Sequence, residues 1–352
     1  MSSNTSDTLP RTNSTFNYLD GDTILRSSDG VQFRVHNIIL RMASPVFDEA
    51  LSLPKPAPKT NVDEDETPQQ DNAQVVYVAE DEKTLATMLS FCYPGPPPSL
   101  GTLKDAKQAL TVAQKYEMDT LDDFFKQKLL AFAEQHPEQV FAIGWAQRWK
   151  DVVMVAAKAT LRKPFLTGAV VDEFDDIPAS AAWKLLAYQR ECIRRCGALA
   201  DSWRIWVTLE DAPRPLGVKA APRSHIPESP CSCPDSVRIT GSDPYNDRTH
   251  PDLMVSRHFV ALMGAIVDAV KGAPHPSTVT SLAVIGQSLV STPSCADCRE
   301  GAVRAVEGFT TRFAERIDGI ISKASVLAML KGLPRPLAHF YLVRLTSLRP
   351  SE

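Results

Sequence analysis

The fold is decided by residues 21–47, GDTILRSSDGVQFRVHNIILRMASPVF. Within this stretch residues 31–35 alternate between apolar and polar, which is the period of a strand with one buried face. Residues 23–27 precede them as a partner strand, and Asp29-Gly30 supplies the positive φ that a tight hairpin turn requires. The sequence therefore predicts a β-hairpin.

A helix is predicted directly after His36, because the apolar period changes there from two residues to three and four. Pro45 ends or restarts this helix, and residues 46–51 mark a second short helix. Two apolar helices this close to a hairpin are expected to pack against it. The apolar face of the first helix consists of Ile38, Ile39, Met42 and Ala43.

The chain has 352 residues and a net charge of −4, which gives no reason to expect nucleic-acid partners. Residues 1–14 are polar and lack the apolar core of a signal peptide. The longest apolar-rich run, residues 259–270, is too short to span a bilayer and contains Asp268. We therefore expect an intracellular protein of cytoplasm or nucleus, without a membrane partner.

Composition divides the chain into five parts. The first folded domain contains an insert at 54–73 with four prolines and the acidic run 63–66, a composition that cannot form a core. The expected parts are a disordered tail at 1–17, a folded domain at 18–130, a helical extension at 131–210, a Pro-rich linker at 211–251 and a helical region at 252–352.

Residues 18–130 resemble a BTB/POZ domain. The resemblance depends on six residues that occur in order over several predicted elements: Asp22, Phe33, His36, Leu40, Ser44 and Phe47. The chain as a whole resembles the BTB proteins that are expanded in mushroom-forming (basidiomycete) fungi. The resemblance implies an α+β fold, a helical cluster capped by a small β-sheet, followed by a mostly α-helical C-terminal region. We expect His36 to be a structural residue at the start of the first helix.

The same resemblance implies a protein-interaction scaffold or adaptor, with a homodimer interface on residues 37–44. Some family members bind a cullin and act as substrate adaptors in ubiquitin ligation, and Val78 and Glu80 match the hydrophobic-x-Glu pattern of that contact. Helices at 137–165 either extend the cullin surface or cover the apolar side of the domain. The alternative is a BTB-containing transcriptional regulator without direct DNA contact, since the chain has no basic stripe.

The seven cysteines include two close pairs, Cys231 with Cys233 and Cys295 with Cys298. Zinc binds four thiolates in a tetrahedron, and C-x-x-C presents two of them from one loop. The pairs are therefore either a structural zinc site, free thiols or a redox pair. Cys192 and Cys196 lie four residues apart on a predicted helix and are expected to be small buried apolar residues.

Phosphate-binding loops, dinucleotide fingerprints and the HExxH and GxSxG motifs are absent from the sequence. An enzyme that uses the cysteines would need a paired base or an oxyanion motif, and neither is recognisable. The sequence therefore predicts a protein that is not an enzyme and needs no cofactor other than structural zinc.

Overall fold

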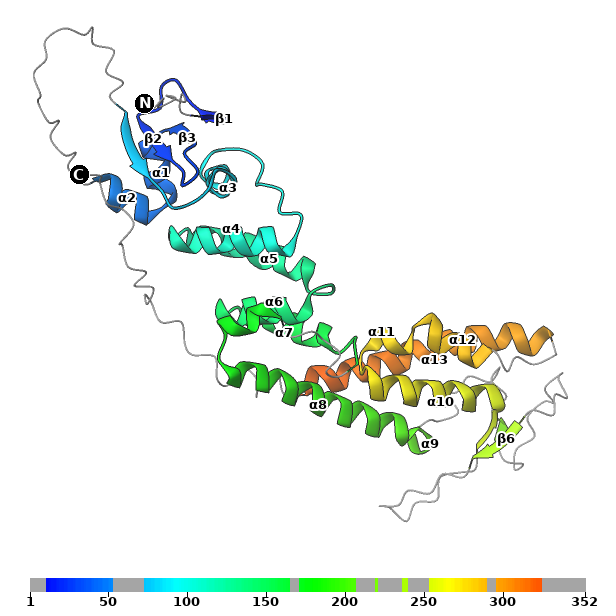
Figure 1. Cartoon of the computed structure of the whole chain (residues 1–352). Helices are drawn as coiled ribbons and strands as arrows, with labels where there is room; N and C mark the ends of the chain where they lie inside the picture. Colours follow the sequence, from blue (N-terminus) through cyan, green and yellow to red (C-terminus); the bar gives the residue numbers. More distant parts are fainter. Residues whose placement is uncertain are drawn as a thin grey trace, which may run out of the picture. The chain divides into compact units, whose positions relative to one another are not determined.

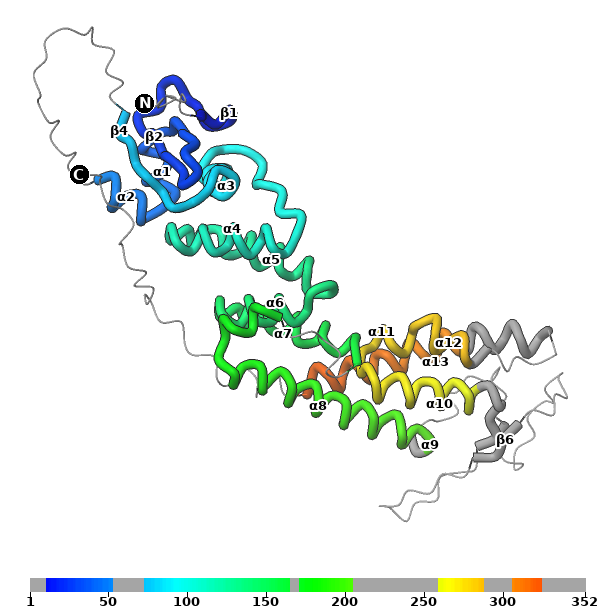
Figure 2. Tube along the Cα trace, in the orientation of Figure 1, coloured from blue at the N-terminus to red at the C-terminus, as the bar shows by residue number. Residues whose placement is uncertain are grey.

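The computed structural model describes residues 11–52, 73–164, 171–206, 219–220, 236–239, 253–289 and 296–324. The chain is divided between Ala131 and Phe132 into two compact units. Figures 1 and 2 show the elements of each unit, coloured along the sequence. Most of the insert predicted at 54–73 lies outside the described residues.

The first unit is built around a four-stranded sheet with the strand order β1-β3-β2-β4. The predicted hairpin is confirmed: β2 and β3 are antiparallel, with Leu25 opposite Phe33, and Gly30 in their turn has a φ of 84°. Strand β4 joins the sheet parallel to β2. The strands are β1 (Thr12–Asn17), β2 (Thr23–Arg26), β3 (Gln32–Val35) and β4 (Gln74–Tyr77).

The expectation of a disordered tail was wrong for residues 12–17, which form β1 parallel to β3. Phe16 is the reason, because its side chain is buried and its ring lies 6.4 Å from that of Phe33 and 5.6 Å from that of Tyr93. The segment TNSTFN has one apolar residue and therefore no alternating pattern. Only the contacts with distant residues make it a strand.

Helices surround this sheet, and α3 and α4 each begin at a residue whose side chain caps a free backbone N–H group. Asp81 accepts a hydrogen bond from the Thr84 amide at the start of α3, and Thr102 accepts one from the Asp105 amide at the start of α4. The helices are α1 (Asn37–Ala43), α2 (Pro45–Ser52), α3 (Glu82–Cys92), α4 (Leu103–Lys115), the 3-10 helix η1 (Asp119–Leu121) and α5 (Asp122–Phe132). The core includes Leu25, Phe33, Leu40, Leu85 and Leu89, which are fully buried.

The second unit is mostly helical, as the sequence predicts. Helix α6 packs on α7, α10 packs on α8 and α12, and α11 packs on α13. Three phenylalanines, Phe259, Phe309 and Phe313, form a buried row between α10 and α13. The elements are α6 (Pro137–Ala146), α7 (Lys150–Thr160), the 3-10 helix η2 (Asp172–Asp176), α8 (Ala179–Asp201), α9 (Trp203–Trp206), α10 (Arg257–Gly272), α11 (Pro276–Val279), α12 (Leu282–Leu289) and α13 (Ala296–Lys323).

Three short strands in this unit differ from the sequence expectation. Strands β5 (Lys219–Ala220) and β6 (Ser236–Ile239) lie in the stretch predicted to lack regular structure, and β7 (Leu253–Ser256) lies where helix is predicted. They form a sheet in the order β5-β7-β6. Strands of two to four residues are too short for a readable period, so pairing rather than pattern defines them. Among the described helices of the whole chain, none is long and apolar enough to cross a membrane.

Two helical glycines of the second unit should respond in opposite ways to an added methyl group. A Cβ on Gly144 would lie 2.8 Å from Val152 Cγ1, so Gly144→Ala pushes α6 and α7 apart and should lower the free energy of unfolding by about 1–3 kcal/mol. A Cβ on Gly264 in α10 meets nothing within 4 Å, so Gly264→Ala should raise it by about 0.5–1 kcal/mol.

Urea unfolding followed by tryptophan fluorescence measures both effects, because all five tryptophans lie after residue 144 and therefore report on this unit. The same sign of change in the two variants would contradict the packing of α6 on α7.

Candidate functional site

The start of α1 is held by a carboxylate from the sequence before the hairpin. Asp22 Oδ1 accepts a hydrogen bond of 2.6 Å from the Asn37 amide, so Asp22 satisfies one of the free N–H groups of α1. The ring of His36 makes no such cap. We expected His36 itself to satisfy the start of this helix, and this detail was wrong.

His36 instead connects three segments. Its backbone N–H donates to Tyr93 Oη at 2.9 Å, its Nδ1 lies 3.0 Å from the same oxygen, and its Nε2 lies 3.3 Å from Asp20 Oδ1. The Tyr93 ring stacks on Tyr18 at 5.0 Å, and burial raises the pKa of Tyr93 to about 12. A neutral tyrosine therefore remains a hydrogen-bond partner of His36 throughout the physiological range, and both ring nitrogens of His36 lie beside partners within the domain.

The end of α1 is held by Ser44, which is fully buried between α1 and α2. Ser44 Oγ donates to the Tyr116 carbonyl at 2.6 Å and accepts from the Phe47 amide at 3.2 Å. Phe47 stacks on the Tyr116 ring with centroids 4.6 Å apart. These contacts join the turn between α1 and α2 to the end of α4.

Because both ends of α1 are held, its rotation is set. Leu40 points into the core and is fully buried, whereas the side chains of Ile38 and Met42 are 61% and 82% exposed. These two residues are four apart and therefore neighbours on the helix surface. We call them the α1 patch. Leu19 is 91% exposed. It directly precedes Asp20, whose carboxylate lies 3.3 Å from His36 Nε2 at the start of this helix.

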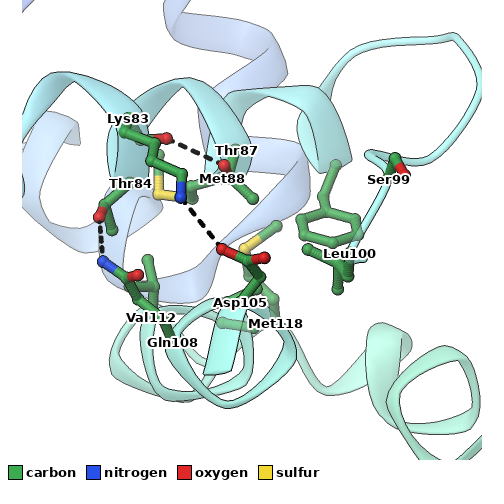
Figure 3. A pocket seen from close by; sticks show the side chains of 13 residues that line it. Lys83, Thr84, Thr87, Met88, Ser99, Leu100, Asp105, Gln108, Val112 and Met118 are labelled. Carbon is green, nitrogen blue, oxygen red and sulfur yellow. Dashed lines mark hydrogen bonds and ion pairs between the residues drawn. The ribbon is translucent and has the colours of Figure 1, made fainter. Parts of the chain in front are cut away.

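A small cavity of about 140 Å³ lies between α3 and α4 (Figure 3). Four of its polar side chains form two pairs: Lys83 Nζ lies 3.0 Å from Asp105 Oδ1, and Gln108 Nε2 donates to Thr84 Oγ1 at 2.7 Å. The Thr102 hydroxyl and Lys83 lower the pKa of Asp105. The rest of the lining is mostly apolar and includes Met88, Phe91, Leu100 and Met118.

The two residues expected to contact a cullin are buried. Val78 and Glu80 are each 8% exposed, and Glu80 accepts hydrogen bonds from Lys115 Nζ at 2.6 Å and Tyr116 Oη at 2.7 Å. Burial, and to a smaller extent Glu80, raises the pKa of Tyr116. Both side chains are thus largely buried inside the domain, and a cullin contact at Val78 and Glu80 stays a prediction.

The predicted zinc ligands Cys231, Cys233 and Cys295 lie outside the described residues, and Cys298 lies in α13 at a position whose side chain is not described. A zinc site there stays a prediction. In the described part of the chain no group of histidine, cysteine and carboxylate side chains could hold a metal ion.

The expectation for Cys192 and Cys196 is confirmed, since both side chains are fully buried in α8. Burial raises the pKa of Cys192 to about 11 and that of Cys196 and Cys92 to about 12. Because the thiolate is the reactive form, these three thiols are poor nucleophiles at neutral pH.

Sequence reasoning missed three contributions to this site: the Tyr93 hydroxyl, the Tyr116 backbone and ring, and the Glu80 carboxylate. Each contact joins residues 36 to 72 positions apart in the chain. The only local signal was an aromatic residue directly after each of two helices, Tyr93 after α3 and Tyr116 after α4. No spacing rule connects such a residue to its distant partner.

Of the six residues that carry the resemblance, Phe33 lies in the hairpin core, and Asp22, His36 and Ser44 lie at the ends of α1. Leu40 is the buried residue of α1, and Phe47 lies in α2. A small sheet with helices packed around it is typical of a domain class that binds other proteins. Residues 15–132 match the family model of the BTB/POZ domain, and this part of the chain is a BTB/POZ domain. A search of curated proteins finds no match to the chain.

Replacing Glu80 should destabilise the BTB/POZ domain whatever its partners are. Glu80→Lys places a second cation beside Lys115 and leaves the buried Tyr116 hydroxyl without its acceptor, so it should lower the free energy of unfolding by about 3 kcal/mol. Differential scanning calorimetry measures this loss.

The matched control is Glu49→Lys on the exposed side of α2, which should change stability by no more than about 0.5 kcal/mol. If the Glu80→Lys variant were as stable as the control, the Glu80 carboxylate would not be required in the interior of the domain.

Proposed function

We propose that this chain is a protein-interaction scaffold whose BTB/POZ domain self-associates through the α1 patch. The observation that supports the proposal is the exposure of Ile38 and Met42 on a helix whose position is fixed at both ends. A rigid apolar surface loses little conformational entropy when it is covered by a partner.

The charged residues next to the α1 patch favour another protein surface as the partner that buries it. Arg41 is the charged residue between Ile38 and the end of α1, and its Nε lies 2.6 Å from Asp48 Oδ1 in α2. The pair brings no net charge to the patch. Full burial of a side chain of this size contributes about 1.5–3 kcal/mol, so Ile38 and Met42 form an effective apolar centre for an interface.

A charged residue in the α1 patch should prevent self-association without unfolding the domain. Met42→Glu and Ile38→Glu each add a carboxylate that would have to be desolvated in the interface, but neither touches the buried Leu40 side of the helix. We expect the unaltered chain to be a dimer and both variants to be monomers in size-exclusion chromatography with light scattering.

The matched control is Met154→Glu in α7, another exposed methionine that lies in the second unit. It should remain dimeric. A monomeric unaltered chain, or a dimer that survives both Met42→Glu and Ile38→Glu, would contradict the proposal.

The sharper form of the proposal is a substrate adaptor for a cullin-type ubiquitin ligase. Its support is the family resemblance and the position of α6 and α7, which follow the BTB/POZ domain directly along the chain. In this form the C-terminal helical region selects the substrate. Since Val78 and Glu80 are largely buried, the contact would also use other residues of the first unit or of α6 and α7.

Calorimetric titration of the full chain with a purified cullin N-terminal domain tests this form. We expect saturable heat with a dissociation constant near 1 μM, about −8 kcal/mol, and the same affinity for the Met42→Glu monomer. No heat and no co-elution would exclude the adaptor form and leave the scaffold proposal to the test above.

A further inference from the structure

The sheet of the first unit has two edge strands that differ in character. Its strand order β1-β3-β2-β4 places β1 at one edge and β4 at the other (Figure 2). The register of β1 against β3 shifts between Thr12 and Asn17, and Phe16 is the one apolar residue of that strand. An irregular register is one way in which a protein keeps an edge strand from pairing with another chain.

The β4 edge has no such irregularity. Its register against β2 is continuous over all four residues of the strand. Residues 73–79, AQVVYVA, contain neither a charged residue nor a proline. The side chains of Val75 and Tyr77 lie two residues apart, and therefore on one face of the sheet, and are 48% and 47% exposed. A regular, apolar edge strand of this kind is a template for a further strand.

The backbone of β4 presents unused hydrogen-bonding groups at this edge. The amides of Gln74 and Val78 both donate hydrogen bonds of 3.0 Å to backbone carbonyls at the two ends of β2. Because the groups of successive residues face opposite sides of a strand, the N–H and C=O groups of Val75 and Tyr77 point away from β2. In the described part of the chain these outward groups make no hydrogen bond.

The outward groups of β4 are complementary to those of a second β4 strand. A two-fold axis perpendicular to the sheet at Val76 places Val75 of one copy opposite Tyr77 of the other. Each such antiparallel pair exchanges two N–H···O bonds. The rotation also keeps the exposed side chains on one face, where valine beside tyrosine is a favourable cross-strand pair. With no charge on the strand, the second copy meets no like charge there.

We propose that the β4 edge is a second self-association surface, at which two copies of this chain join their sheets in antiparallel register. The pairing itself does not depend on the α1 patch. Where both contacts form, two different self-complementary surfaces on one chain link dimers into larger assemblies. The contact between two four-residue strands is small, so it is weaker than a standard interface and acts where the protein is concentrated.

Sedimentation equilibrium of the full-length Met42→Glu variant isolates this contact from the α1 patch. Between about 5 and 500 μM we expect a reversible monomer–dimer equilibrium with a dissociation constant on the order of 100 μM, so the variant is monomeric at the lower concentrations of size-exclusion chromatography. Adding Val75→Lys/Tyr77→Lys places lysine opposite lysine across the two-fold axis. This change should raise the dissociation constant at least about tenfold.

The matched control is Val75→Lys/Tyr77→Glu in the same Met42→Glu chain. It replaces the same two half-exposed side chains but places lysine opposite glutamate in the proposed register, so its dissociation constant should stay within about threefold of that of Met42→Glu alone. Equal weakening by the two double changes, or no dimer of Met42→Glu at about 500 μM, would overturn the proposal.

Hydrogen exchange followed by mass spectrometry tests the same contact without any change in β4. In the Met42→Glu chain, the outward amides of Val75 and Tyr77 should exchange more slowly as the protein concentration rises, because the second copy binds them. Exchange of residues 73–78 that does not depend on concentration would show that no second copy pairs at this edge, and would also overturn the proposal.

Discussion

The hydrogen bonds at the two ends of α1 are the constraint on which the rest of the BTB/POZ domain depends. Asp22 holds the first turn and Ser44 holds the last, and the two hydrogen bonds join residues 15 and 72 positions apart in the sequence. A seven-residue helix is too short to be stable by its own backbone bonds. Fixing both ends sets its rotation, which buries Leu40 and leaves Met42 in solvent.

The buried carboxylate of Glu80 shows why a short motif needs its structural context. In the sequence Val78-Ala79-Glu80 matches a partner-binding pattern, and an acidic residue near a strand end is usually solvated. In the structure Lys115 and Tyr116 both bind the Glu80 carboxylate, so it stabilises the contact of α4 with the end of β4. An ion pair with two hydrogen bonds is what allows a carboxylate to be buried at all.

Burial raises the pKa of the described thiols Cys92, Cys192 and Cys196, and two pairs of polar side chains at the α3–α4 cavity bind each other. The exposed apolar face of α1, with Ile38 and Met42, is a preorganised surface, which loses little conformational entropy when a partner covers it.

The sequence by itself determined the hairpin, the helices α1 and α2, and the resemblance to the family of the domain. Hydrophobic period and turn residues act between residues that are close along the chain, so one sequence is enough to read them. Only the tertiary structure decided that residues 12–17 form β1, that Glu80 is buried, and that Ile38 and Met42 face outward. These outcomes depend on contacts between residues tens of positions apart, and no local pattern records which of two apolar faces will be covered.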